Sequence, residues 1–338
     1  MKNLWLACCI SALCVVLLSA CGGSSNTSAN NPAFQLPAVK QFTDGIEKNP
    51  EDASLYYKRG KALHGVQLDS LALDDFKKAV SLDSSKAEYY SAIGDLLFEH
   101  KDIDGSLQWI TKAIKLNPKD PGAHLKMAKL FIYTKDYTSA FAEINTVLRQ
   151  DVYNPEGYFL KGVIYKELKD TTRAVSSFHT AVQVQPAYRD AIIQLGLMYS
   201  MKKDVSALQY FESAYRLDSN DVFPLYAKGV FYQDMNDFKN AKEQYTLAIL
   251  KDRDYPDAYF NMGYILLQQD SLEKAKRQFD IITQLEPNDP EAYYNRGLCS
   301  ELMGMKDEAI KDYKQALIFD DTYKEPQDGL KRLAASAK

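Results

Sequence analysis

The feature that most constrains the fold of this chain is a small residue that recurs about every 34 positions. The steps are 34 residues, except for one of 33. Such a period indicates a repeated supersecondary unit, because one unit of this size cannot bury its apolar face without neighbours. A chain of 338 residues is then expected to grow along one axis instead of around one compact core. The small residues are Gly60, Gly94, Ala128, Gly162, Gly196, Gly229, Gly263 and Gly297.

A second set of residues follows these positions at fixed spacing. Ala174 lies twelve residues after Gly162, and Phe178 four residues further; most units repeat this order. We expect Gly162 and Ala174 to lie where the two helices of one unit approach most closely, because larger side chains would separate them. Residues 155–188 show the pattern best, with Tyr158, Gly162, Tyr165, Ala174, Phe178, Ala181 and Pro186.

This pattern resembles that of the tetratricopeptide repeat (TPR) family. The departure in residues 155–188 is Lys161, which stands where the family has an apolar residue. The resemblance implies an all-α fold, a right-handed α-solenoid in which each unit contributes two antiparallel helices, helix A and helix B.

Capping signals set the register of the units. Asp120-Pro121, Asn154-Pro155 and Asp289-Pro290 each place a capping side chain before a proline suited to the first helical turn. The fifth unit is one residue short between Gly196 and Ala207, where we expect a tightened loop and not a lost repeat. The eight TPR units predicted within 53–323 are 53–86, 87–120, 121–154, 155–188, 189–221, 222–255, 256–289 and 290–323.

Both ends of the repeat array are predicted to be capped. Residues 36–52 resemble the second helix of a preceding unit and are expected to form an N-terminal capping half-repeat. Residues 324–338 are expected to form a C-terminal capping helix, with Leu330 and Leu333 on its apolar face.

The N-terminus has the pattern of a secretion signal. Residues 4–18 are nearly all apolar but fall short of the roughly 20 residues that a membrane-spanning helix needs. The tetrad Leu18-Ser19-Ala20-Cys21 resembles the lipobox of bacterial lipoproteins. The resemblance implies a signal peptide at 1–20 and a lipidated Cys21 whose acyl chains anchor the protein to a membrane. An ordinary signal, or an uncleaved anchor, is the alternative.

Residues 21–35 are predicted to be the lipidated cysteine and a flexible linker, since they are mostly Gly, Ser, Asn, Thr and Ala. Gly22 stands where lipoproteins retained in the inner membrane often have Asp, and no acidic residue precedes Asp44. By resemblance we expect an outer-membrane lipoprotein that faces the periplasm, with inner-membrane anchoring as the alternative.

No sequence feature predicts catalysis, a cofactor or a metal site. The net charge of −4 provides no basic field for phosphates, so nucleic acid is not an expected partner. His64, His100, His124 and His179 lie in four different units, without metal-ligand spacing. Cys299 falls on the packed side of a helix A, where a core thiol is expected. We therefore predict that the protein is not an enzyme.

In the TPR family the concave wall is lined by helix A, chiefly at the second, fifth, ninth and twelfth positions. In units one to three the fifth and ninth residues are mixed: Tyr57 and Lys61, Ser91 and Asp95, and Leu125 and Lys129. In units four to eight these positions are all apolar or aromatic: Phe159, Val163, Ile193, Leu197, Tyr226, Val230, Phe260, Tyr264, Tyr294 and Leu298.

These ten residues predict a partner-binding groove. Apolar side chains at the ninth position are unusual for the family, and an exposed apolar stripe marks a binding surface for an extended segment or an amphipathic helix. The alternative is that the ten side chains pack against neighbouring helices. The groove would be rimmed by the second-position carboxylates Glu156, Asp190, Asp257 and Glu291.

The sequence thus predicts a non-catalytic scaffold, anchored to the bacterial envelope, that binds a protein or peptide partner. A structural subunit of an envelope assembly machine, for pilus, secretion or outer-membrane-protein assembly, is the alternative. An enzyme or glycan-binding protein would require converging carboxylates, and the apolar stripe argues against that arrangement.

Overall fold

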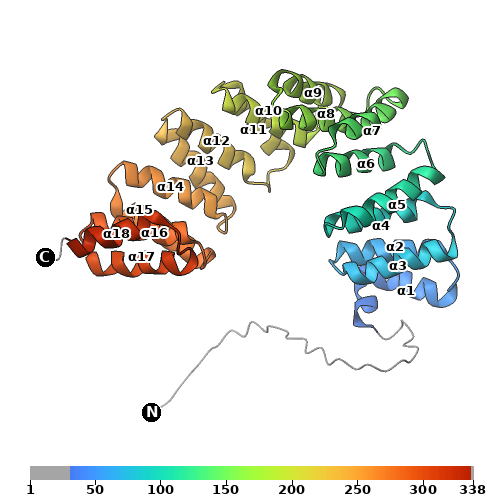
Figure 1. The fold of residues 1–338 in the computed structure, drawn as a ribbon, viewed down its shortest axis with the longest axis horizontal. Helices are drawn as coiled ribbons and strands as arrows, with labels where there is room; N and C mark the ends of the chain where they lie inside the picture. The colour runs from blue at the N-terminus through green and yellow to red at the C-terminus, as the bar shows by residue number, and fades with distance from the viewer. Residues whose placement is uncertain (1–30, 336–338) are drawn as a thin grey trace, which may run out of the picture. The chain divides into compact units, whose positions relative to one another are not determined.

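The computed structural model describes residues 31–335 of the chain, and every regular element within them is a helix. The chain divides into two compact units, Met1–Pro118 and Lys119–Lys338, which are described separately. The predicted all-α repeat fold is confirmed (Figure 1).

The first compact unit consists of a short 3-10 helix and five α-helices. After α1, the helices form two antiparallel hairpins, α2 with α3 and α4 with α5. The elements are η2 (Pro32–Gln35), α1 (Pro37–Lys48), α2 (Ala53–Gly65), α3 (Asp69–Leu82), α4 (Ala87–Glu99) and α5 (Ile103–Leu116).

The second compact unit contains six hairpins and a final helix. Within this unit, helices that are consecutive along the chain pack against each other. The hairpins are α6 (Pro121–Tyr133) with α7 (Tyr137–Gln150), α8 (Pro155–Glu167) with α9 (Thr171–Val184), α10 (Arg189–Met201) with α11 (Ser206–Leu217), α12 (Phe223–Asp234) with α13 (Phe238–Lys251), α14 (Pro256–Gln268) with α15 (Leu272–Leu285), and α16 (Pro290–Leu302) with α17 (Lys306–Phe319), and α18 (Lys324–Ala335) ends the array.

The predicted helix starts are confirmed by their caps. The side chains of Asp120, Asn154 and Asp289 each accept a hydrogen bond from a backbone N–H in the first turn, at 3.0, 2.9 and 2.8 Å. These bonds satisfy donors that have no partner inside the helix.

The small residues allow the close helix contact that the sequence predicts. A Cβ atom built on Gly162 would lie 2.5 Å from Cε1 of Phe178, whose ring is completely buried. Ala174 is also completely buried. Helix A therefore rests directly on the aromatic ring of its own helix B.

The fifth unit differs from its prediction. Residues 202–205 separate α10 from α11, whereas residues 168–170 suffice between α8 and α9. The missing residue shortens α11 to 12 residues from the 14 of α9, so the prediction of a tightened loop is wrong, while both helices are present. The turn keeps its left-handed residue, Lys203, at φ 55°.

The predicted linker 21–35 extends too far. Residues 32–35 form η2, and Phe34 is 6% exposed in the core of the first compact unit. The linker composition hides this contact, because a single aromatic side chain is enough to fasten the segment. The predicted signal peptide, and Cys21 with its lipid, lie outside the described residues.

Candidate partner-binding face

The ten predicted groove residues come from the same face of five A helices. They are the fifth and ninth residues of repeat units four to eight and lie on α8, α10, α12, α14 and α16, and side chains four apart on a helix lie one above the other. We call this set of ten residues the helix-A face. Nine of them are half-buried, and Tyr264 is 41% exposed.

The fifth-position aromatic residues contribute to the core as well as to the surface. The Phe159 ring lies 5.7 Å from that of Phe178 and 5.4 Å from that of Tyr188, measured between centroids. Tyr226 lies 6.0 Å from Tyr245 and 5.5 Å from Tyr255 in the same arrangement. These distances are typical of stabilising aromatic pairs. The alternative reading, packing against neighbouring helices, therefore holds in part for this half of the face.

The ninth-position residues differ from one another. Val163, Leu197 and Val230 border the buried clusters of their units. Tyr264 and Leu298 are members of no buried cluster among the described residues. Tyr264 is therefore the member of the face whose side chain is most available to a partner.

Sequence reasoning missed a second set of tyrosines beside this face. Tyr188, Tyr255 and Tyr323 are each the last residue of their unit, and each packs against the fifth-position ring of that same unit. Burial, together with carboxylates nearby, raises the pKa of Tyr188 and of Tyr255 to about 12. Their hydroxyls stay protonated and can donate hydrogen bonds. The signal that could have found them is the tyrosine directly before Arg189, Pro256 and Lys324.

Carboxylates surround the helix-A face. Glu156 pairs with Lys129 at 2.6 Å, whereas Asp190, Asp257 and Glu291 form no salt bridge within residues 31–335. Asp257 lies near enough to Tyr226 and Tyr255 to contribute to the raised pKa of both. The face thus combines apolar side chains with negative charge that is not neutralised.

The corresponding positions of the first repeats are more polar. Tyr57 packs between Phe76 and Tyr89, at 5.9 and 5.0 Å between ring centroids, and Lys61 lies over the Tyr57 ring.

The reactive side chains lie elsewhere. Cys299 is completely buried, and burial raises its pKa to about 11, as a core thiol requires. His64 and His100 meet across repeats at Asp69, with ring nitrogens 2.8 and 2.9 Å from its oxygens, a proximity that their separation in sequence did not reveal. Residues 31–335 hold no group of three His, Cys, Asp or Glu side chains suited to a metal ion.

A membrane-spanning helix is not found in the part of the chain that the structure describes, since its helices are too short or too polar.

Comparison with known proteins gives matches to three models of the tetratricopeptide repeat. They cover residues 87–120 and 155–188, residues 232–297, and residues 290–323. The chain is 29% identical over 83 residues to Hsp70-Hsp90 organizing protein 3 of Arabidopsis thaliana, a stretch of 25% of this chain and 15% of that relative. The chain thus spans only a small part of the relative's length.

Two solved structures share the fold. The yeast Tom70 structure aligns with a TM-score of 0.56 at 18% identity, over 93% of this chain and 66% of that one. The structure of PilW, described as a type IV pilus biogenesis factor, aligns with a TM-score of 0.53 at 18% identity, over 62% of this chain and 98% of that one.

Proposed function

We propose that this chain, which belongs to the tetratricopeptide repeat family, is a non-catalytic scaffold that binds a partner protein or peptide on its helix-A face. Proteins of this family mediate protein–protein interactions. The observation that carries the proposal is the exposed Tyr264, set among nine half-buried apolar side chains on one side of α8 to α16. A row of this kind suits an extended or helical segment that inserts apolar side chains.

The charge of the face selects among such segments. Asp190, Asp257 and Glu291 have no cationic partner within residues 31–335, and desolvating unpaired carboxylates on binding would be unfavourable. A partner segment with Lys or Arg beside its apolar residues would neutralise them and would associate faster at low salt. We therefore propose a segment that is both apolar and basic.

The attachment is also a proposal. Cys21 in the tetrad Leu18-Ser19-Ala20-Cys21 supports a lipid anchor in the bacterial envelope, at the periplasmic side of the outer membrane. Two or more acyl chains give stable membrane association. Cys21→Ala should release the protein from the membrane fraction, and continued attachment of that variant would contradict the lipid anchor.

The test of the binding face uses Tyr264→Asp, because Tyr264 can be changed with little loss of packing. Intact cells that express the full chain are cross-linked, and the proteins captured with wild type and variant are compared. The matched control is Leu247→Asp on α13, since Leu247 is 42% exposed and lies outside the face. We expect a partner to be lost from Tyr264→Asp and kept by Leu247→Asp.

Two outcomes decide the proposal. Loss of the same partner from both variants, or from neither, would contradict binding at the helix-A face. Val230→Asp would not serve as this test, because Val230 borders the core of α12 and α13 and its replacement would also destabilise the fold.

A further inference from the structure

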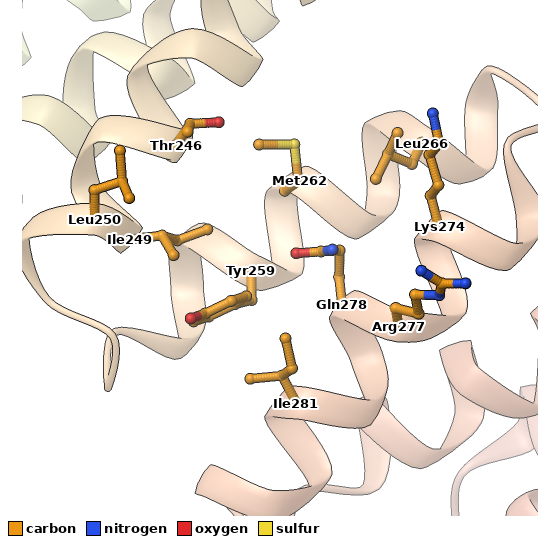
Figure 2. Close-up of a pocket in the computed structure, with 10 residues that line it drawn as sticks. All are labelled: Thr246, Ile249, Leu250, Tyr259, Met262, Leu266, Lys274, Arg277, Gln278 and Ile281. Atoms are coloured by element: carbon orange, nitrogen blue, oxygen red, sulfur yellow. The ribbon is translucent and has the colours of Figure 1, made fainter.

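A cavity of about 500 Å³ opens between α13, α14 and α15 (Figure 2). On α14 its walls are Tyr259, Met262 and Leu266, which lie on the opposite side of the helix from Phe260 and Tyr264. The cavity is therefore separate from the helix-A face, and nothing in the proposed function accounts for it.

The lining combines an apolar interior with a basic edge. Ile249 and Leu250 of α13 and Ile281 of α15 add to the apolar walls, and Leu250 is 69% exposed. Lys274 and Arg277 lie along one edge in Figure 2. Arg277 forms a salt bridge with Glu273 at 2.6 Å, whereas Lys274 forms no ion pair within residues 31–335. The edge thus has uncompensated positive charge.

In the first repeat, the position that corresponds to the cavity is occupied by an aromatic side chain. Helices α2 and α14 have equal lengths, as do α3 and α15, so Met262 corresponds to Arg59 and Gln278 to Asp75. The Phe34 ring lies 4.0 Å from the Arg59 guanidinium carbon, measured to the ring centroid. Phe34 comes from the 3-10 helix η2 before α1, and it is itself buried.

The residues around Phe34 are more buried than the corresponding residues that line the cavity. Thr43 and Ile46 of α1, which correspond to Thr246 and Ile249 of α13, are 2% and 5% exposed. Thr246 is exposed and Ile249 half-buried. In the last repeat the corresponding residue, Arg296, spans the space by pairing with Asp280 of α15 and Asp312 of α17. Met262 makes no such bridge, so the cavity stays open.

We propose that this cavity is a docking site for a short segment of a partner protein, of the kind that η2 forms, that carries an aromatic side chain next to a carboxylate. The aromatic ring occupies the place that corresponds to that of Phe34 in the first repeat, between the second helix of one unit and both helices of the next. The carboxylate pairs with Lys274 at the basic edge. The site is independent of the helix-A face and recognises the opposite charge.

The test uses a fluorescein-labelled peptide, Asp-Pro-Ala-Phe-Glu-Leu, which copies residues 31–36 with acidic residues in place of Asn31 and Gln35. Its binding to the purified full chain is measured by fluorescence anisotropy. We expect saturable binding, an at least tenfold loss when the peptide Phe is replaced by Ala, and a several-fold, salt-dependent loss with Lys274→Glu.

Two protein variants test the location. Thr246→Trp fills the mouth of the cavity from an exposed position and should weaken binding at least tenfold. Leu250→Glu places a negative charge against the acidic peptide and should weaken binding to the same extent. This second variant decides the test if the Trp variant does not fold. Tyr264→Asp, on the helix-A face, is the control and should bind as wild type does. The proposal is overturned by absence of saturable binding up to millimolar peptide, or by equal binding to the cavity variants. Self-association of wild type that Thr246→Trp abolishes, seen by sedimentation velocity, would assign the cavity to a second copy and also overturn it.

Discussion

Replacement of Gly162 by Ala tests whether helix A is held at the distance that the small residue permits. The new Cβ would lie 2.5 Å from Cε1, 2.6 Å from Cδ1 and 2.9 Å from Cζ of Phe178, whereas ordinary contact begins near 3.4 Å. The ring would have to move by about 1 Å, and it is completely buried beside Phe159. Overpacking of this kind costs about 1–3 kcal/mol.

A gain opposes this cost, because alanine stabilises a helix interior by about 0.5–1 kcal/mol relative to glycine. We therefore expect Gly162→Ala to lower the free energy of unfolding by about 1 kcal/mol, the difference between the midpoints of the two terms. Gly65 is the matched control, since a Cβ there would meet no atom within 4 Å. Gly65→Ala should stabilise the chain by about 0.5 kcal/mol.

The assay must resolve individual repeats, because a solenoid need not unfold as one unit. Amide hydrogen exchange measured across α8 and α9 reports the local free energy of opening. Gly162→Ala should accelerate exchange there, and Phe178→Leu, which removes the edge of the ring, should reduce the effect of the glycine substitution. Unchanged or slower exchange in Gly162→Ala would refute the close contact as the reason for the glycine.

Two further predictions concern buried polar groups. Arg59 and Asp75 are 2% and 5% exposed and form two hydrogen bonds of 2.7 and 2.8 Å. Arg59→Met should therefore lower the local free energy of opening of α2 and α3, measured by hydrogen exchange, by about 3–5 kcal/mol. Arg59→Met/Asp75→Gln, the pair found at Met262 and Gln278, should recover most of this loss, and equal losses in both variants would contradict the ion-pair explanation. Burial lowers the pKa of His179 below its ordinary 6.5, so its contribution to stability is complete above that pH and declines as the pH falls below it. His179→Phe keeps an aromatic ring beside Tyr199 and Tyr210 and should show a smaller loss of melting temperature between pH 7 and pH 5, whereas an unchanged pH profile would exclude His179 as its source.

The repeat period predicts most of the fold because it encodes local contacts. The spacing from Gly162 to Phe178 specifies a contact within one hairpin, and the capping residues Asp120, Asn154 and Asp289 act on the next few backbone amides. Contacts of this range depend on a few neighbouring residues, so the sequence pattern is sufficient to predict them.

Features that depend on a break in the period could not be predicted in the same way. The residue missing from the fifth unit could have shortened a loop or a helix, and the first residues of α11 are lost because the turn keeps its left-handed residue, Lys203. Phe34 lies outside the repeats in a segment with the composition of a linker, and its burial depends on the Arg59 side chain that covers it.

The helix-A face shows why apolar character alone does not identify a binding residue. Phe159 and Tyr226 occupy the fifth position of their units, yet each is packed between a ring of its own helix B and the tyrosine that precedes the next helix A. At the ninth position no such tyrosine covers Tyr264, and it belongs to no buried cluster of the described chain. On α14 itself, Phe260 packs against Phe279 of α15 at 5.7 Å between ring centroids, whereas Tyr264, four residues later, is exposed. The difference arises from the rings of the same unit that cover the fifth-position residue, and for that reason substitutions at Tyr264 separate binding from folding where substitutions at the fifth position cannot.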